Sequence, residues 1–289
     1  MPPRPPGILG VSLRGRQPPL PVLGFRARSA ALASNAEAAS AVPETQPVPP
    51  ARWVSDVRTR IGKCIMFGCD TAQTRRAAAV LATLASEWRV LSAESEGFLV
   101  AGLEGQKVVW GEMDSFGHVN NAAYIRYAES ARVNWILHFA AHDPAHREAW
   151  CDLMRPRTIG LIMKSIKADY KFPMTAPDSI SVYPKLSRPP EATHTSLMLD
   201  CVVFSHRHRR IAARTAEEIS LYDYRAATKT VLPTFMLDVL RDAWRRQQER
   251  TDLARARIWD LLARVEGLEK ETWDREDAVE DLGAAGKGV

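Results

Sequence analysis

Two acidic residues and a histidine near the middle of the chain have the types and spacing needed for chemistry at a carbonyl group. Asp114 and His118 lie in one polar turn that contains Gly117, and Glu129 follows further along. A carboxylate at the end of an apolar strand is partly desolvated, which raises its basicity. Backbone N–H groups at the start of a helix attract anions or polarise a carbonyl oxygen. This order suggests a base or nucleophile next to an oxyanion donor.

The elements that must position these groups are a strand, a turn and a helix. The apolar run Val108-Val109-Trp110 is typical of a buried strand. Asn120 or Asn121 stands where a helix N-cap is expected. The pattern is then helical as far as about Phe139, with apolar residues three and four positions apart on one face. These residues are Tyr124, Ala128, Ala131, Trp135 and Phe139.

This stretch resembles the 4-hydroxybenzoyl-CoA-type acyl-CoA thioesterases of the hotdog superfamily. The resemblance lies in Asp114-x-x-Gly117-His118-Val119-Asn120-Asn121, then Tyr124, then Tyr127-Ala128-Glu129-x-Ala131-Arg132. As far as about Tyr224 the likeness is one of pattern only. It implies an α+β hotdog fold, in which an antiparallel sheet wraps around a central helix. It also implies an acyl-CoA or other acyl-thioester substrate, no metal or redox cofactor, and a homodimer or higher homo-oligomer.

The resemblance also implies roles for individual residues. Asp114 would attack the thioester or activate water, and the backbone N–H of Asn121 would stabilise the oxyanion. Gly117 would allow the backbone to approach the substrate closely. His118 would orient Asn120 or the pantetheine arm. Asn120 and Tyr124 complete the predicted substrate-binding residues of the motif.

Other interpretations of the same residues stay open. Asp114 is also suited to accepting local hydrogen bonds in a tight turn. Glu129 could pair with Arg132 or Arg126 at three-residue spacing, or it could be the catalytic carboxylate, as in a second branch of hotdog thioesterases. His118 before the helix and Glu129 inside it resemble the His and acid pair of the hotdog dehydratases. The loop lacks the Pro-rich run of those enzymes, so we rank dehydration below hydrolysis.

A basic run, His206-Arg207-His208-Arg209-Arg210, falls in an expected hairpin turn. Because coenzyme A carries several phosphate charges, Arg207, Arg209 and Arg210 are candidate substrate-binding residues. A solvated surface is the alternative. Three further histidines, His138, His142 and His146, recur every four residues, but Pro144 interrupts a helix between the last two and we predict no metal site.

The net charge of +5 does not indicate nucleic-acid binding, because the excess of basic residues is confined to the first part of the chain. Residues 1–62 hold eight Arg against three acidic residues, whereas residues 63–289 hold 31 basic and 31 acidic residues. The four cysteines form neither a CxxC pair nor a dense disulfide framework, which favours a reducing environment. No apolar run reaches the roughly 18–20 residues needed to span a bilayer.

Four strand candidates after the central helix predict an antiparallel sheet. They cover residues 158–172, 179–186, 195–204 and 211–222, separated by breaks of the kind that hairpins need. Helical patterns flank this core. They cover residues 53–60 and 72–91 before it, and two runs after Pro233 that are separated by the charged stretch 245–250.

The chain therefore divides into four expected regions. Residues 1–50 read as a transit peptide and Pro-rich linker, because residues 1–36 contain five Arg and no acid, and eleven prolines lie in the first 50 residues. A disordered tail is the alternative. Residues 51–97 are an expected helical extension, 98–225 the hotdog domain, and 226–289 a helical tail. The composition of the leader predicts a mitochondrial location.

The leading interpretation is a mitochondrial acyl-CoA thioesterase with Asp114 as base or nucleophile. The alternative is a non-catalytic hotdog protein that binds an acyl thioester or serves in an assembly. A cleft at Asp114 and no Lys or Arg neutralising its carboxylate would favour the enzyme, whereas a salt bridge would favour the scaffold.

Overall fold

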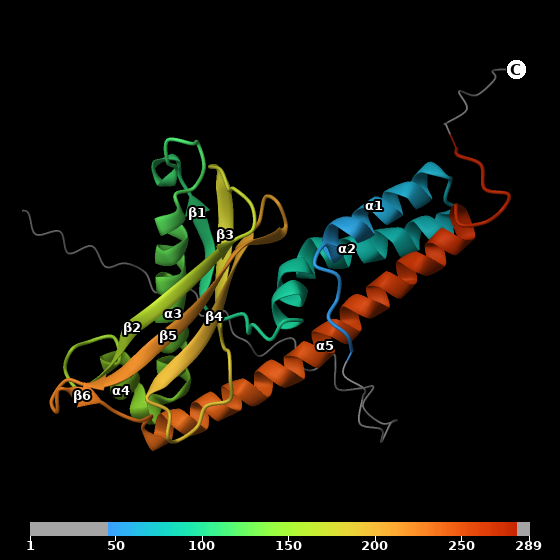
Figure 1. Ribbon diagram of the computed structural model, residues 1–289. Coiled ribbons are helices and arrows are strands. Elements are labelled where there is room, and N and C mark those ends of the chain that lie inside the picture. Colours follow the sequence, from blue (N-terminus) through green and yellow to red (C-terminus); the bar gives the residue numbers. More distant parts are fainter. Residues whose placement is uncertain (1–45, 282–289) are drawn as a thin grey trace, which may run out of the picture. The chain divides into compact units, whose positions relative to one another are not determined.

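The computed structural model describes residues 46–281 (Figure 1). The expected transit peptide and most of the linker therefore lie outside the described residues. The helices are α1 (Trp53–Met66), α2 (Thr71–Glu94), α3 (Asn121–His142), α4 (Arg147–Asp152) and α5 (Thr234–Thr272), with short 3₁₀ turns at Trp110–Glu112 and Pro144–His146. The strands are β1 (Leu103–Val108), β2 (Ile159–Tyr170), β3 (Asp178–Leu186), β4 (Ser196–Ser205), β5 (Arg210–Asp223) and β6 (Thr228–Lys229). No helix in this part of the chain combines the length and apolar character that crossing a membrane requires.

The strands form one antiparallel sheet in the order β1-β3-β4-β5-β2, and β6 pairs with the end of β5. Helix α3 lies along one face of this curled sheet (Figure 1). The α+β hotdog fold expected from the resemblance is thus confirmed, together with the extra helices before and after it. One expected hairpin is wrong. β2 pairs with β5 and not with β3, so the segment between β2 and β3 crosses from one edge of the sheet towards the other.

The strand register places the segments that carry the predicted site residues at one end of the sheet. Val108 at the end of β1 is paired with Asp178 at the start of β3. The β4–β5 hairpin closes at the same end, where Ser205 is paired with Arg210. β2 ends there as well, because Tyr170 is paired with Ala213. The polar turn and the basic hairpin therefore share one end of the fold.

The core on the α3 face of the sheet consists of two hydrophobic clusters, one along each half of α3. The first half of α3 packs with Ile180, Val182, Cys201 and Val203, and its second half packs with α4, β3, β4 and the start of α5. The helix face predicted from the spacing is confirmed, since all five of its apolar residues are buried. This burial fixes the rotation of α3 about its axis, and with it the direction of the helix N-terminus.

A second helical layer covers part of the opposite face of the sheet. Tyr183, Val202 and Phe204 point away from α3 and pack against α1, α2 and the second half of α5. Residues 201–204 of β4 are therefore buried on both faces. This explains why the sequence of this strand is a nearly unbroken apolar run and not an alternation.

Three sequence expectations are corrected by the structure. The strand predicted at 108–110 ends at Val108, and Trp110 is 80% exposed because the chain leaves the sheet there for the turn. The two helical runs after Pro233 form one uninterrupted helix, α5, and its charged stretch 245–250 contains Gln247, which is buried and hydrogen-bonded to the backbone of Leu186. The last residues of the expected linker are packed on α5, where Trp259 Nε1 donates to the carbonyl of Pro47 at 2.9 Å.

Candidate active site

The turn after β1 is closed by its own backbone hydrogen bonds. Asp114 N donates to the carbonyl of His118 at 2.8 Å, and Gly117 N donates to the carbonyl of Asp114 at 3.0 Å. Met113 and Val119 form an isolated antiparallel bridge at its base. Gly117 has a φ of +75°, in the left-handed region that side chains other than glycine disfavour. The turn thus needs a glycine at this position for its backbone conformation.

Helix α3 begins directly after the turn, and Asn120 is its N-cap. The side-chain oxygen of Asn120 accepts from Ala122 N at 2.8 Å, and its carbonyl accepts from Ala123 N at 2.9 Å. Among the described residues no acceptor binds the backbone N–H of Asn121. An unpaired N–H at the positive end of a helix is a suitable donor for an anionic oxygen.

The carboxylate of Asp114 is half-buried and takes part in the turn. Its Oδ1 accepts from Phe116 N at 2.9 Å and from His118 N at 3.5 Å. The local hydrogen bonding expected of a structural aspartate is therefore present. Within residues 46–281, no cation forms an ion pair with this carboxylate, and Oδ2 has no hydrogen-bond partner. One oxygen holds the turn while the other is free to act as a base or nucleophile.

The imidazole and the second carboxylate are exposed. His118 lies on the surface of the turn, and Glu129 lies on the outer face of α3. Arg132, one of the two arginines that the spacing offered to Glu129, instead forms a buried ion pair with Glu217 on β5. At 1.5 Å of rise per residue, Glu129 is about 12 Å along the helix axis from Asn121. This separation favours Asp114 over Glu129 as the group that works with the helix N-terminus.

Tyr124 has a different position from the one expected of a substrate-contacting residue. It is buried, its ring contacts that of Tyr170 at 5.2 Å, and its hydroxyl accepts from Met174 N at 3.4 Å. Burial raises the pKa of this phenol. Met174 in turn accepts from Val119 N at 2.9 Å. Tyr124 therefore holds the segment between β2 and β3 against the turn, and its contact with substrate stays a prediction.

Sequence reasoning missed two groups that support the turn. The carbonyl of Glu112 accepts from Asn120 N, and its carboxylate accepts from Val109 N at 3.0 Å. The buried hydroxyl of Tyr127 lies near this carboxylate but has no hydrogen-bond partner among the described residues, and burial, followed by Glu112, raises the pKa of Tyr127 strongly. Tyr127 stands in the motif that carries the resemblance, but nothing in the sequence pairs it with Glu112.

The basic hairpin is held by a buried carboxylate. Asp178 Oδ2 accepts from Ser205 Oγ at 2.5 Å, and its Oδ1 accepts from Arg207 N at 3.0 Å. The guanidinium of Arg210 lies 3.9 Å from the ring centroid of Phe172. Arg209 and Arg210 line a pocket, whereas Arg207 is not among its lining residues.

The prediction that His138, His142 and His146 form no metal site stays a prediction. His142 Nδ1 lies 2.8 Å from the carbonyl of His138, and His146 pairs with Asp143. In the part of the chain that the structure describes, no cluster of three His, Cys, Asp or Glu residues is placed to hold a metal ion.

Residues 108–240 match the family model of the thioesterase-like superfamily. The match starts at the end of β1 and includes the turn, α3, the remaining strands and the first turns of α5. Helices α1 and α2 lie outside it. This part of the protein is therefore thioesterase-like in sequence and a hotdog in fold. A comparison with curated proteins finds no match.

Solved structures match about half of the chain at low identity. The PA2801 protein from Pseudomonas aeruginosa is 22% identical, with a TM-score of 0.39, over 48% of this chain and 97% of its own. A thioesterase from Thermus thermophilus, solved with coenzyme A and Zn, is 19% identical, with a TM-score of 0.38, over 53% and 98%. Slr0204, a 1,4-dihydroxy-2-naphthoyl-CoA thioesterase from Synechocystis, is 13% identical, with a TM-score of 0.39, over 49% and 96%.

Proposed function

We propose that the protein is an acyl-CoA thioesterase of the 4-hydroxybenzoyl-CoA type. The observation that carries the proposal is an unneutralised carboxylate in the turn that leads directly into a helix whose first N–H is unpaired. The free oxygen of Asp114 and the N–H of Asn121 supply the two functions that thioester hydrolysis needs. The match of this stretch to the thioesterase-like superfamily supports the proposal that the bond cleaved is a thioester.

The chemistry follows two routes that use the same residues. As a base, Asp114 takes a proton from water while the water oxygen attacks the thioester carbonyl. As a nucleophile, Asp114 attacks the carbonyl itself, and water then hydrolyses the resulting anhydride. In both routes the N–H of Asn121 stabilises the oxyanion, the C–S bond breaks, and the thiolate leaves and is protonated.

The proposal includes a homodimer. β2 is a twelve-residue strand at the edge of the sheet, with no strand paired to its outer side in the described chain. Trp110 and Phe116, which flank Asp114, are 80% and 83% exposed. Large apolar side chains so exposed are suited to burial against a second subunit. We also propose a mitochondrial location, on the Arg-rich composition of residues 1–36.

A non-catalytic thioester-binding protein is the second candidate, because Oδ1 of Asp114 is engaged in the turn. The two are separated by free-thiol release from a panel of short-chain, long-chain and aromatic acyl-CoAs, with the chain started near Ala31. Release that exceeds the uncatalysed rate with at least one substrate supports the enzyme. Saturable binding of the same panel without release supports the binding protein.

A further inference from the structure

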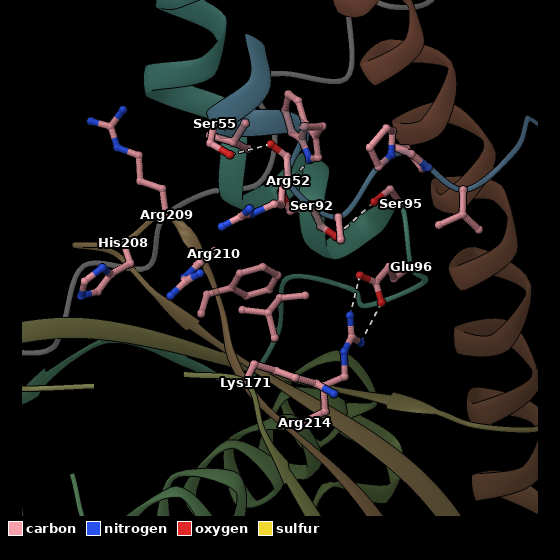
Figure 2. Close-up of a pocket in the computed structure, with 18 of the residues that line it drawn as sticks. Arg52, Ser55, Ser92, Ser95, Glu96, Lys171, His208, Arg209, Arg210 and Arg214 are labelled. Atoms are coloured by element: carbon pink, nitrogen blue, oxygen red, sulfur yellow. Dashed lines mark hydrogen bonds and ion pairs between the residues drawn. The ribbon is translucent and has the colours of Figure 1, made fainter. Parts of the chain in front are cut away.

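A pocket of about 510 Å³ lies between the N-terminal helical layer and the β4–β5 hairpin (Figure 2). Ligand pockets in proteins are typically about 300–1,000 Å³. One wall comes from residues 48–58 and 92–96, and the other from the β4–β5 hairpin, β5 and Lys171, which directly follows β2. The first wall lies outside the residues that match the thioesterase-like superfamily, so the pocket is built partly by this chain's own extension.

The pocket is strongly cationic. Its lining includes Arg52, Arg58, Lys171, Arg209, Arg210 and Arg214, and the single carboxylate that lines it is that of Glu96. Glu96 is already bound by Arg214 through two contacts of 2.7 Å. The other five cations form no ion pair with any residue of the described chain. Residues 63–289 hold 31 basic and 31 acidic residues, so the four cations that this part of the chain contributes to the pocket are a local excess.

Several of these charges are held in place. Arg214 is fixed by Glu96, and Arg210 lies over the ring of Phe172. Figure 2 shows Arg52 reaching from the N-terminal segment into the same space as Arg210. A guanidinium fixed in advance loses less side-chain entropy when it binds an anion. The arrangement is therefore more than a set of mobile surface charges.

The N-terminus of α1 opens into the same pocket. Trp53 N and Asp56 N are occupied by backbone carbonyls at 3.0 Å. Between them, Val54 N and Ser55 N, which belong to lining residues, have no acceptor in the part of the chain described here. Unpaired N–H groups at the positive end of a fourteen-residue helix add to the attraction for phosphate oxygens. Apolar lining residues, among them Val48 and Ile211, offer a surface for a planar base.

The pocket is connected to the candidate active site through a short segment. Lys171 lines the pocket, and Met174, three residues later, binds Val119 next to the Asp114 turn. Three residues of fully extended chain span at most about 11 Å. A ligand with phosphates at one end and a reactive group at the other can therefore reach both places.

We propose that this pocket binds the phosphorylated nucleotide end of the acyl-CoA, with Arg52 and Arg210 contacting its phosphates from opposite walls. This inference rests on the proposed function for the identity of the ligand. It adds a role for the helical layer, which would complete the substrate site with Arg52, Arg58 and the start of α1.

The test is the binding of adenosine 3′,5′-bisphosphate, measured by calorimetry on the full chain at low salt. This probe contains no thioester, so the result does not depend on whether the protein hydrolyses one. We expect saturable binding that weakens with added salt. Arg52→Ala and Arg210→Ala should each weaken binding about tenfold or more, the loss expected for one charge-assisted contact. Arg75→Ala, which removes an exposed arginine of α2 outside the pocket, should bind as the wild type does.

Three outcomes overturn the proposal. Unchanged affinity in both pocket variants means that the phosphates bind elsewhere, and no binding at millimolar probe means that the pocket does not hold a nucleotide. Pyrophosphate is measured in parallel. If it binds as tightly as the nucleotide, the pocket is a simple anion site and the assignment to coenzyme A is wrong.

Discussion

Arg132 on α3 and Glu217 on β5 form an ion pair of 2.5 Å inside the protein, and the side chain of Glu217 is fully buried. Thr215 Oγ1 donates to the other carboxylate oxygen at 2.9 Å. Removing one partner of such a pair leaves an uncompensated buried charge. We expect Arg132→Met to lower the free energy of unfolding in urea by about 3–5 kcal/mol.

An exposed arginine provides the control for this prediction. Arg245 on α5 contacts Asp242 and Glu249 on the surface, and Arg245→Ala should cost less than about 1 kcal/mol. A loss below about 1 kcal/mol in Arg132→Met would show that the pair does not tie α3 to the sheet.

His206 makes stability depend on pH. Its ring lies 2.9 Å from Ser181 Oγ, and burial followed by the charge of Arg89 lowers its pKa below the usual 6.5, although Glu104 opposes this. The imidazole of His206 therefore binds a proton near pH 6.5 in the unfolded chain, but only at a lower pH in the folded chain. Stability is complete above this pH and declines as the pH falls through the lower, folded-state value.

The matching experiment is urea unfolding of His206→Gln and the wild type between pH 7 and pH 5. The wild type should lose more stability over this range, and the variant should show a shallower dependence. His208→Gln, which removes an exposed imidazole from the same hairpin, should follow the wild type. Equal slopes in all three proteins would refute the assignment to His206.

Gly117 tests whether the turn needs its left-handed backbone. A Cβ at this position would meet nothing within 4 Å, so the cost of Gly117→Ala comes from φ alone. We expect a loss of about 1–2 kcal/mol in unfolding free energy. Gly267→Ala, at an equally open position within α5, should instead gain up to about 1 kcal/mol. Equal effects of the two substitutions would mean that the turn relaxes without strain.

The exposed aromatics beside Asp114 test the proposed dimer. We expect the wild type to sediment as a dimer at micromolar concentration. The Trp110→Ala, Phe116→Ala double variant should have a dimer dissociation constant at least about tenfold higher, because burying large side chains contributes several kcal/mol. Leu253→Ala removes a side chain on α5 that is 62% exposed and should not change the dimer. A monomeric wild type would contradict this part of the proposal.

Much of the fold could be predicted from local patterns. The four long strands begin and end within about two residues of their predicted limits, because each is bounded by proline, glycine or charged residues that break it. The N-cap at Asn120 could also be predicted, since an asparagine at the start of an apolar helical stripe is a strong local signal. These features depend on neighbouring residues only.

What the sequence could not provide depends on distant contacts. The spacing allowed Glu129 to pair with Arg132 or Arg126, but Arg132 pairs with Glu217, which lies 85 residues further along the chain. Val202 and Phe204 are buried by helices from both ends of the chain, which no strand pattern indicates. The basic run in the hairpin could be recognised in the sequence. That Arg52 and Arg58 line the same pocket could be seen only in the structure, because they lie about 150 residues earlier in the chain.

The most direct test of the central claim is steady-state free-thiol release by Asp114→Asn, with Glu129→Gln as the matched carboxylate control. Asn keeps an oxygen that can accept from Phe116 N but removes the base or nucleophile. We therefore expect kcat to fall about a hundredfold or more, the scale for losing a catalytic base. Glu129→Gln should stay close to the wild type. Full activity in Asp114→Asn, or a collapse in Glu129→Gln alone, would contradict the account.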